Sequence, residues 1–451
     1  MNRPNFIFIL TDDQGWEDLQ SFGHPYLKTP NLDRLADEGT SFTQSYVSSP
    51  VCSPSRVSFM TGHYPARHNV HHIYRPERSR ERMKEEGVPP FLDPETTTLT
   101  GVLRENGYVT GHFGKWHMGN VREAPPPSKY GIDDARVCAA PPQYEGWPEW
   151  RDDDQPYWWA RSTDLFVDET IRFIEENQDR PFYVNLWSLI PHAPLNPTPE
   201  QLAEYDDLKA DPADFRAWMR PYLERAENLD DKMKIYCASM TSLDTAIGRL
   251  LDYLDQAGLA QDTFIFFTSD NGPEDYCVGN ASNAGVGSPG QGRARKRSIY
   301  EGGVRTPSIA RWPGRIPAGR VDDESVIGAV DWFPTVCQIA GVTMPHIQPD
   351  GENILDVLSG NPRPRKNPLF WEWKCNVFGD DDYHPPELAV REGDWKLFMN
   401  PNGSAVELYD LVDDPTECED VAADHPGVVE RLTKRLADWK STLPDGFEYG
   451  D

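Results

Sequence analysis

The chain of 451 residues is 38% apolar and contains 14 Trp, which is enough for a large hydrophobic core, most simply one big domain with a smaller one. Its net charge of −29 opposes nucleic acid and anionic membranes as partners, because binding to phosphates needs a basic face. A small anionic substrate stays compatible, since salt screens exposed charges beyond about 8 Å and a local cationic pocket can operate on an acidic protein.

Seven cysteines are spread along the chain without a C-x-x-C pair, and this pattern predicts neither a zinc knuckle nor a redox pair. The N-terminus leads directly into an apolar run without a signal peptide, and no segment approaches the roughly 18 apolar residues of a membrane-spanning helix. We expect a cytoplasmic protein as the sequence is written, or a periplasmic or secreted one if a leader was removed.

The first element is a continuous apolar run at 5–10, which predicts a buried, parallel strand. It leads to Asp12 and Asp13, and open α/β sheets bind ligands at such strand ends. Two adjacent carboxylates are costly there unless they are solvated or bound to a metal, so a solvated turn is the alternative to a metal site. A helix follows at 29–35.

The segment from Val51 onwards carries Cys52, with Pro54 where we expect a helix to begin. Cys52 would then lie at a helix N-terminus, where free N–H groups favour an anion. A thiol phosphatase loop is excluded, because it needs Arg six residues after the Cys, whereas Arg56 comes at plus four and Ser58 stands at plus six. Taken alone, Cys52 is better interpreted as a buried free cysteine in a loop, and only the rest of the chain favours a reactive residue.

A basic, His-rich segment at 71–75 contains His72 and Arg75, which either line a substrate cleft or lie in a solvated loop. After a helix at 98–106, a strand at 108–113 leads to a second group of chemical side chains, Lys115 and His117. Strand alternation places these two on the same side.

The region 141–159 is rich in Pro, Trp, Tyr and Asp and is expected to be a long loop that contributes to specificity. A helix at 165–177 and a buried strand at 182–187 then deliver His192 in a Pro–His–Ala–Pro turn. Residues 195–232 are acidic, and we expect them to form a helical insertion that is interrupted at its Pro residues.

A long helix at 236–257 precedes a further apolar strand at 263–267, which leads to Asp270 and Asn271. A Gly-rich, basic stretch closes with Arg295–Lys296–Arg297. A strand at 305–311, a helix at 331–340, a Pro-rich connection at 361–368, four short strands and a closing helix at 427–440 complete the chain.

Six motifs in this order resemble those of the type I sulfatases of the alkaline phosphatase-like superfamily. They are T-P-N-L-D-x-L from Thr29, C-x-P-x-R from Cys52, G-K-W-H-x-G from Gly114, P-H-x-P from Pro191, S-D-N-G from Ser269 and Y-E-G-G-x-R-x-P from Tyr300. The Arg391–Lys396 and Glu407–Leu411 segments resemble marks of the family's C-terminal part. The G-G-K-G context of the family's active-site Lys is here Arg–Lys–Arg, which leaves Lys296 or a neighbouring Arg to touch the sulfate.

The resemblance implies an α/β fold: a large mixed, mostly parallel sheet sandwiched by helices at 1–362, and a smaller C-terminal α+β subdomain with an antiparallel sheet at 363–451. It also implies that Cys52 is oxidised to formylglycine by a formylglycine-generating or anaerobic maturation enzyme. An oxygen-rich metal set follows, which suits Ca²⁺ or Mg²⁺ and not zinc. Its members are Asp12, Asp13, residue 52, Asp270 and Asn271.

The roles of the remaining residues follow the family. One hydroxyl of the aldehyde hydrate at residue 52 attacks sulfur, and Asp270 takes its proton while Arg56 holds the modified side chain. Lys115 and Lys296 neutralise sulfate oxygens, and His192 with Lys296 protonates the leaving oxygen. His117 takes the proton of the second hydroxyl as sulfate is released.

The expected activity is hydrolysis of a sulfate monoester, by preference exo-acting on a sulfated carbohydrate. The alternatives are an arylsulfatase acting on small aryl or alkyl sulfates and a phosphate or phosphonate ester hydrolase of the same superfamily. A degenerate sulfatase that only binds sulfated glycan and a hydrolase using the Cys52 thiol are two further alternatives.

Overall fold

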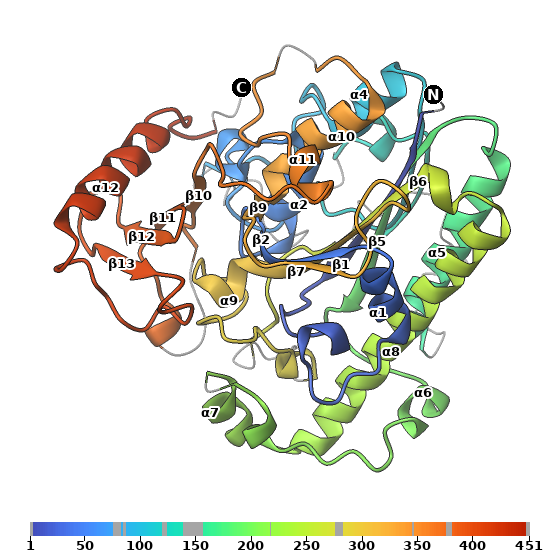
Figure 1. Ribbon diagram of the computed structural model, residues 1–451, viewed down its shortest axis with the longest axis horizontal. Helices are drawn as coiled ribbons and strands as arrows, with labels where there is room; N and C mark the ends of the chain where they lie inside the picture. Colours follow the sequence, from blue (N-terminus) through green and yellow to red (C-terminus); the bar gives the residue numbers. More distant parts are fainter. Residues whose placement is uncertain are drawn as a thin grey trace.

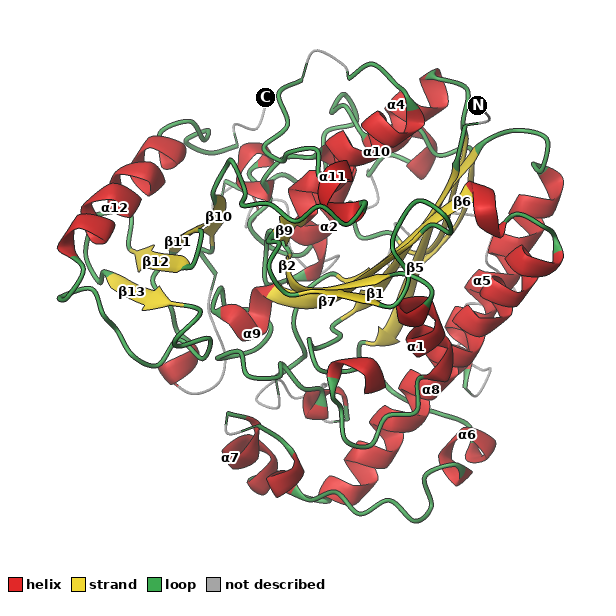
Figure 2. Cartoon of the chain, viewed as in Figure 1, coloured by secondary structure: helices red, strands yellow, loops and turns green. Residues whose placement is uncertain are grey.

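The computed structural model describes residues 3–74, 83, 87–119, 124–138, 157–216, 218–275, 283–344, 347–375 and 381–447. Within this part of the chain, helices cover a nine-stranded sheet, and a separate four-stranded sheet with its own helix lies beside it (Figure 1). Figure 2 shows the two sheets in yellow, with helices above and below the larger one.

The larger sheet has the strand order β4-β3-β5-β1-β6-β7-β2-β8, with β9 also paired to β2. Its strands are β1 (Asn5–Asp12), β2 (Thr40–Tyr46), β3 (Val109–Lys115), β4 (Asp134–Cys138), β5 (Phe182–Pro191), β6 (Thr263–Ser269), β7 (Arg305–Arg311), β8 (Arg320–Asp322) and β9 (Ile327–Gly328). Strand β7 pairs antiparallel with β6 and with β2, and the other pairs are parallel. The predicted mixed, mostly parallel sheet is therefore confirmed.

Strand β1 is at the centre of the core, because all eight of its residues are buried between β5 and β6. Phe8 on this strand packs with rings from both neighbouring strands and from helices on one face, including Phe59 at 4.9 Å and Trp332 at 4.9 Å between ring centroids. A fully buried Phe stabilises the fold by roughly 1.5–3 kcal/mol. This packing gives the ends of β1 and β6 a rigid base.

Helices lie on both faces of the larger sheet (Figure 1). One group is α1 (Pro30–Asp37), α5 (Trp158–Glu176) and α8 (Leu229–Gln256); the other is α2 (Cys52–Thr61), α4 (Leu99–Glu105), α10 (Trp332–Ala340) and α11 (Leu355–Leu358). Three short helices lie in connections: α6 (Pro199–Ala203), α7 (Met219–Glu224) and α9 (Glu301–Val304). None of the helices in the described ranges is long and apolar enough to cross a membrane.

The second sheet is antiparallel, with strand order β10-β11-β12-β13. Its elements are β10 (Leu369–Glu372), β11 (Leu388–Glu392), β12 (Trp395–Met399), β13 (Glu407–Asp410) and the closing helix α12 (Pro426–Lys440). The predicted C-terminal antiparallel sheet is thus confirmed, whereas the domain boundary at 362 and 363 stays a prediction.

Two expected helix starts and one expected loop need correction. Helix α2 begins at Cys52 with Val51 as its N-cap, two residues before the expected Pro54. Trp158 and Trp159 form the first turn of α5 instead of a loop, while 139–156 lie outside the described residues. Helix α8 begins at Leu229, where its polar first turn hid the start from a search for apolar periodicity.

Candidate functional site

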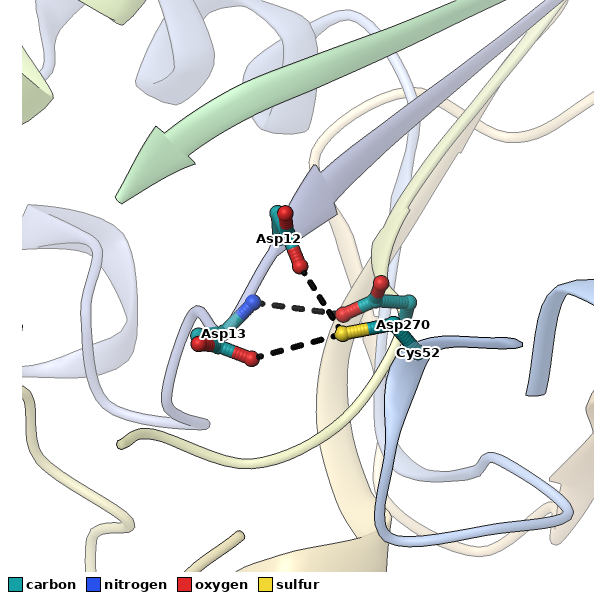
Figure 3. A group of neighbouring side chains, drawn as sticks. All are labelled: Asp12, Asp13, Cys52 and Asp270. Atoms are coloured by element: carbon teal, nitrogen blue, oxygen red, sulfur yellow. Dashed lines mark hydrogen bonds between the residues drawn. The ribbon is translucent and has the colours of Figure 1, made fainter. Parts of the chain in front are cut away.

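Two strand ends bring three carboxylates together at one edge of the larger sheet (Figure 3). Asp12 is the last residue of β1, and Asp13 follows it with a φ of 67°. Asp270 comes directly after β6, and its Oδ1 accepts a hydrogen bond from the Asp13 backbone N–H at 3.2 Å. The parallel pairing of β1 with β6 is what sets these acids side by side.

Cys52 reaches the same place from the first residue of α2 (Figure 3). Its Sγ lies 3.2 Å from Asp12 Oδ1 and 3.9 Å from Asp13 Oδ1. One ligand atom from each of Asp12, Asp13, Cys52 and Asp270 lies within 4.8 Å of the others, and all four residues are buried. Four of the five residues predicted to hold the cation therefore lie close together.

The chemistry of this cluster fits a hard cation. Asn271 Nδ2 donates to Asp13 Oδ1 at 2.7 Å, and Asn271 Oδ1 is buried without a hydrogen-bond partner among the described residues. A half-turn of the carboxamide would place Oδ1 beside Asp13 Oδ1, an arrangement that two oxygens adopt only with a cation between them. Three carboxylates and an amide oxygen are ligands that Ca²⁺ and Mg²⁺ prefer.

Three cations surround the carboxylates. Arg56 donates from Nε and Nη2 to Asp270 Oδ2 at 2.9 and 2.6 Å. Lys115 Nζ lies 2.5 Å from Asp12 Oδ2, and Lys296 Nζ lies 2.5 Å from Asp13 Oδ2. Each cation thus has a carboxylate partner, as buried charges require.

The surrounding charges shift the pKa values of Asp12 and Asp270 in opposite directions. Burial would raise the pKa of Asp12, but Lys115, His192 and Arg56 outweigh it and hold that pKa well below its usual value. Burial and the repulsion of Asp12 raise the pKa of Asp270 to about 7, despite Arg56. Burial, then Asp12 and Asp270, raise the pKa of the Cys52 thiol well above its usual value, so that the thiol stays protonated.

The two predicted histidines lie at the edge of this cluster. His192 Nε2 is 3.7 Å from Asp13 Oδ2, while Nδ1 is 2.6 Å from the Ala193 carbonyl and must carry a proton there. His117, with a φ of 59°, directs Nε2 to the Tyr74 carbonyl at 3.1 Å. Its Nδ1 has no hydrogen-bond partner among the described residues and is the basic nitrogen.

The two predicted substrate contacts outside the cluster, His72 and Arg75, stay predictions. The His72 ring lies 6.2 Å from the Trp373 ring, beside the C-terminal sheet, and Arg75 lies outside the described residues. Trp159, from the aromatic segment, donates its Nε1–H to the His192 carbonyl at 2.9 Å. A contribution of that segment to substrate binding stays a prediction.

The structure shows which of the three consecutive cations, Arg295, Lys296 and Arg297, contacts the carboxylate cluster. Arg295 donates to the Glu274 and Gly285 carbonyls at 2.9 and 3.0 Å and so supports the surrounding loops. Lys296 enters the cluster, and Arg297 binds the Glu274 carboxylate. Sequence reasoning missed Glu274, although an acid three residues after Asn271 was a usable signal.

Comparisons with known proteins agree with this geometry. The sulfatase family model matches residues 4–342, and that of the N-sulphoglucosamine sulphohydrolase C-terminal region matches residues 291–442. N-acetylgalactosamine-6-sulfatase of Canis lupus familiaris is 32% identical over 392 residues, covering 82% of this chain and 68% of the relative. Human arylsulfatase A is 29% identical over 511 residues, covering 99% and 89%.

A solved structure of Ps i-CgsB in complex with k-i-k-neocarrahexaose is similar along almost the whole chain. It has a TM-score of 0.78 and 25% sequence identity, and the match covers 99% of this chain and 95% of that one. The chain therefore belongs to the type I sulfatases of the alkaline phosphatase-like superfamily and is an enzyme that hydrolyses sulfate esters.

Proposed function

We propose that this protein removes sulfate from a sulfated carbohydrate by exo-acting hydrolysis, with formylglycine made from Cys52 and Ca²⁺ or Mg²⁺ as its cation. The observation that carries this proposal is the placement of Cys52 among three carboxylates, with Lys115 and Lys296 each within 2.5 Å of one of them. Nucleophile position, cation ligands and sulfate-binding charges therefore meet in one buried site.

Asp12, Asp13, Asp270 and Asn271 would hold the cation. When bound, it supplies a Lewis acid for the sulfate group and favours the ionised nucleophile. Lys115 and Lys296 flank it and would neutralise sulfate oxygens, and such preorganised charge commonly makes the largest contribution to catalysis.

Residue 52 would act as an oxygen nucleophile. The raised pKa of the Cys52 thiol opposes a thiolate mechanism. A hydrated aldehyde supplies one hydroxyl that suits a hard cation and a second that allows sulfate to leave. Cys52 is only 1% exposed, so the maturation enzyme would have to reach it before the chain folds.

The neighbouring side chains suit the proton transfers. As the family implies, Asp270 would accept the proton of the attacking hydroxyl, while Arg56 holds Asp270 and the charge at residue 52 in place. Asp12 accepts the hydrogen bond of the thiol, but its low pKa makes it the weaker base.

The histidines would act at the two later steps. His192 presents Nε2 to the site because its Nδ1–H is held by the Ala193 carbonyl. Burial lowers the pKa of His192, while Asp12 and Asp13 oppose that shift. Nε2 would therefore protonate the leaving oxygen only in the imidazolium form, with Lys296 as the second proton donor. Burial, with Lys115 and Arg56, holds the pKa of His117 well below its usual value. His117 is therefore neutral and able to accept the proton of the second hydroxyl at Nδ1.

The substrate class rests on the relatives. One is named for a sulfated amino sugar, and a similar solved structure holds a neocarrahexaose. The experiment is a screen of defined sulfated mono- and oligosaccharides, with protein co-produced with a maturation system and the residue-52 peptide checked by mass. Aryl sulfates and phosphate esters run in parallel. Sulfate release from the aryl ester alone, or faster phosphate release, would overturn the carbohydrate assignment.

A further inference from the structure

Arg297 occupies a backbone conformation that favours glycine. Its φ is 74°, in the left-handed region, which is unfavourable for a residue with a side chain. Its N–H donates to the Pro50 carbonyl at 2.9 Å, two residues before Cys52. An Arg kept there against local preference suggests that its side chain has a task.

The Arg297 side chain binds both carboxylate oxygens of Glu274. Arg297 Nη2 lies 3.1 Å from Glu274 Oε2, and Nη1 contacts Oε1. Lys296 Nζ lies 3.1 Å from the same Oε2. The three side chains therefore form a continuous ionic chain that ends at Lys296, and all three residues are buried.

Glu274 is an unusual neighbour for an anionic substrate. Its carboxylate lies within 4.8 Å of ligand atoms of Asp13 and His192, on the side where Lys296 enters. Lys296 therefore has two carboxylate partners, Asp13 and Glu274. The negative charge of Glu274 would however repel a sulfate ester unless another cation offset it.

Arg297 is one of four cationic side chains that face the four carboxylates of the site. The carboxylates are Asp12, Asp13, Asp270 and Glu274, and the cations are Arg56, Lys115, Lys296 and Arg297. The proposed divalent cation would add two further positive charges. Without Arg297 the protein side of the site would be one charge more negative. In a buried site this excess is weakly screened.

Resting on the proposed sulfatase function, we propose that Glu274 and Arg297 form a charge-compensated positioning pair: Glu274 fixes the Lys296 ammonium for the sulfate group, and Arg297 cancels the repulsion that Glu274 would exert on it. Neither residue touches the reacting atoms. The pair tunes affinity for the sulfate group through charge and sets turnover through the position of Lys296.

Four variants separate charge from architecture: Arg297→Met, Arg297→Lys, Glu274→Gln and the double variant Glu274→Gln with Arg297→Met. The cation-loaded, matured protein is titrated with inorganic sulfate, and with chloride at equal ionic strength. Binding is read from the thermal shift and from competitive inhibition of aryl sulfate hydrolysis.

Arg297→Met should weaken sulfate binding about tenfold, because Glu274 loses one of its two cationic partners and the site becomes one charge more negative. Arg297→Lys should keep most of the affinity, and the double variant should return to within about threefold of the wild type, since removing both charges restores the balance. Glu274→Gln should lower kcat about tenfold without weakening sulfate binding, because Lys296 loses one of its two carboxylate partners while the charge becomes more positive.

Equal loss of sulfate affinity in Arg297→Met and Arg297→Lys, or a double variant no better than Arg297→Met, would overturn this inference, because the effect would then be one of shape. An active wild type shows that such a result concerns the pair alone. A matured wild type that neither hydrolyses sulfate esters nor shifts with sulfate would instead overturn the proposed function, and this inference with it.

Discussion

Replacing Lys396 by Met should destabilise the junction between the two sheets. Lys396 is fully buried in β12, and its Nζ lies 2.8 Å from Glu301 Oε1 and 2.9 Å from Glu417 Oε1. Glu301 opens α9, which leads into β7 of the larger sheet, whereas Glu417 follows β13. One ammonium therefore joins two carboxylates across the two sheets.

The loss of unfolding free energy in Lys396→Met can be estimated from the contacts that the variant loses and keeps. Met fills a similar volume, so little packing is lost, but two buried carboxylates lose their shared cation. Breaking a buried ion pair from one side costs about 3–5 kcal/mol. Tyr46 still donates to Glu301 Oε2 at 2.6 Å, and the Glu301 N–H to Glu417 Oε2 at 2.6 Å, which keeps the expected loss within that range.

The loss should grow with pH. Burial and the repulsion of Glu301 already raise the pKa of Glu417 to about 7, and without Lys396 that pKa rises further. Below about pH 7 Glu417 is protonated in both proteins, so the variant avoids part of the cost. Above pH 7 the wild type ionises Glu417 beside Lys396, whereas the variant must either keep Glu417 protonated or bury its charge without a cation. The difference from the wild type should therefore be larger at pH 8 than at pH 5.

The assay is urea unfolding followed by tryptophan fluorescence, since Trp371 lies 5.3 Å from the Lys396 ammonium and reports on the junction. Lys434→Met is the matched control: Lys434 pairs with Asp438 at 2.6 Å, but their side chains are 75% and 66% exposed. It should cost less than about 1 kcal/mol. Equal losses in Lys396→Met and Lys434→Met, or a Lys396→Met loss independent of pH, would refute the reasoning.

Three further predictions concern the site. Cys52→Ala or Cys52→Ser should abolish turnover with the fold intact by circular dichroism, and substantial residual activity would contradict the modified residue. Exhaustive chelation should lower both activity and melting temperature. For a protein held at a cation concentration of a hundred times Kd, the free energy of unfolding should fall by about 2.7 kcal/mol. No change in either, with no metal found by metal analysis, would contradict the presence of a cation site. Lys115→Met should lower kcat about 10²–10³-fold in sulfate release assays, whereas a change confined to KM would mean that Lys115 only binds the ground state.

The fold was predictable where apolar runs are long. The runs at 5–10, 182–187 and 263–267 became β1, β5 and β6, because strands buried on both faces leave an uninterrupted apolar signature. Strand β2, with the sequence TSFTQSY, carries no such signature and was missed. Its place is set by pairing with β7, β8 and β9, which no local pattern encodes.

The site, like the fold, was predictable from the sequence only in part. Asp12, Cys52 and Asp270 could be assigned because each stands at the tip of an element whose position the sheet fixes, so motif and topology give the same answer. The sequence could not decide among three adjacent cations, because side-chain direction there depends on a left-handed φ at residue 297.

That local geometry turns Arg297 onto Glu274 while Lys296 enters the cluster. It also makes the charge of the sulfate pocket depend on a contact between residues 23 positions apart. In a buried pocket, one such contact would shift affinity for an anion, since little solvent screens it. We therefore expect the affinity of this site for sulfate to depend as much on how its cations are paired as on which cations the motifs supply.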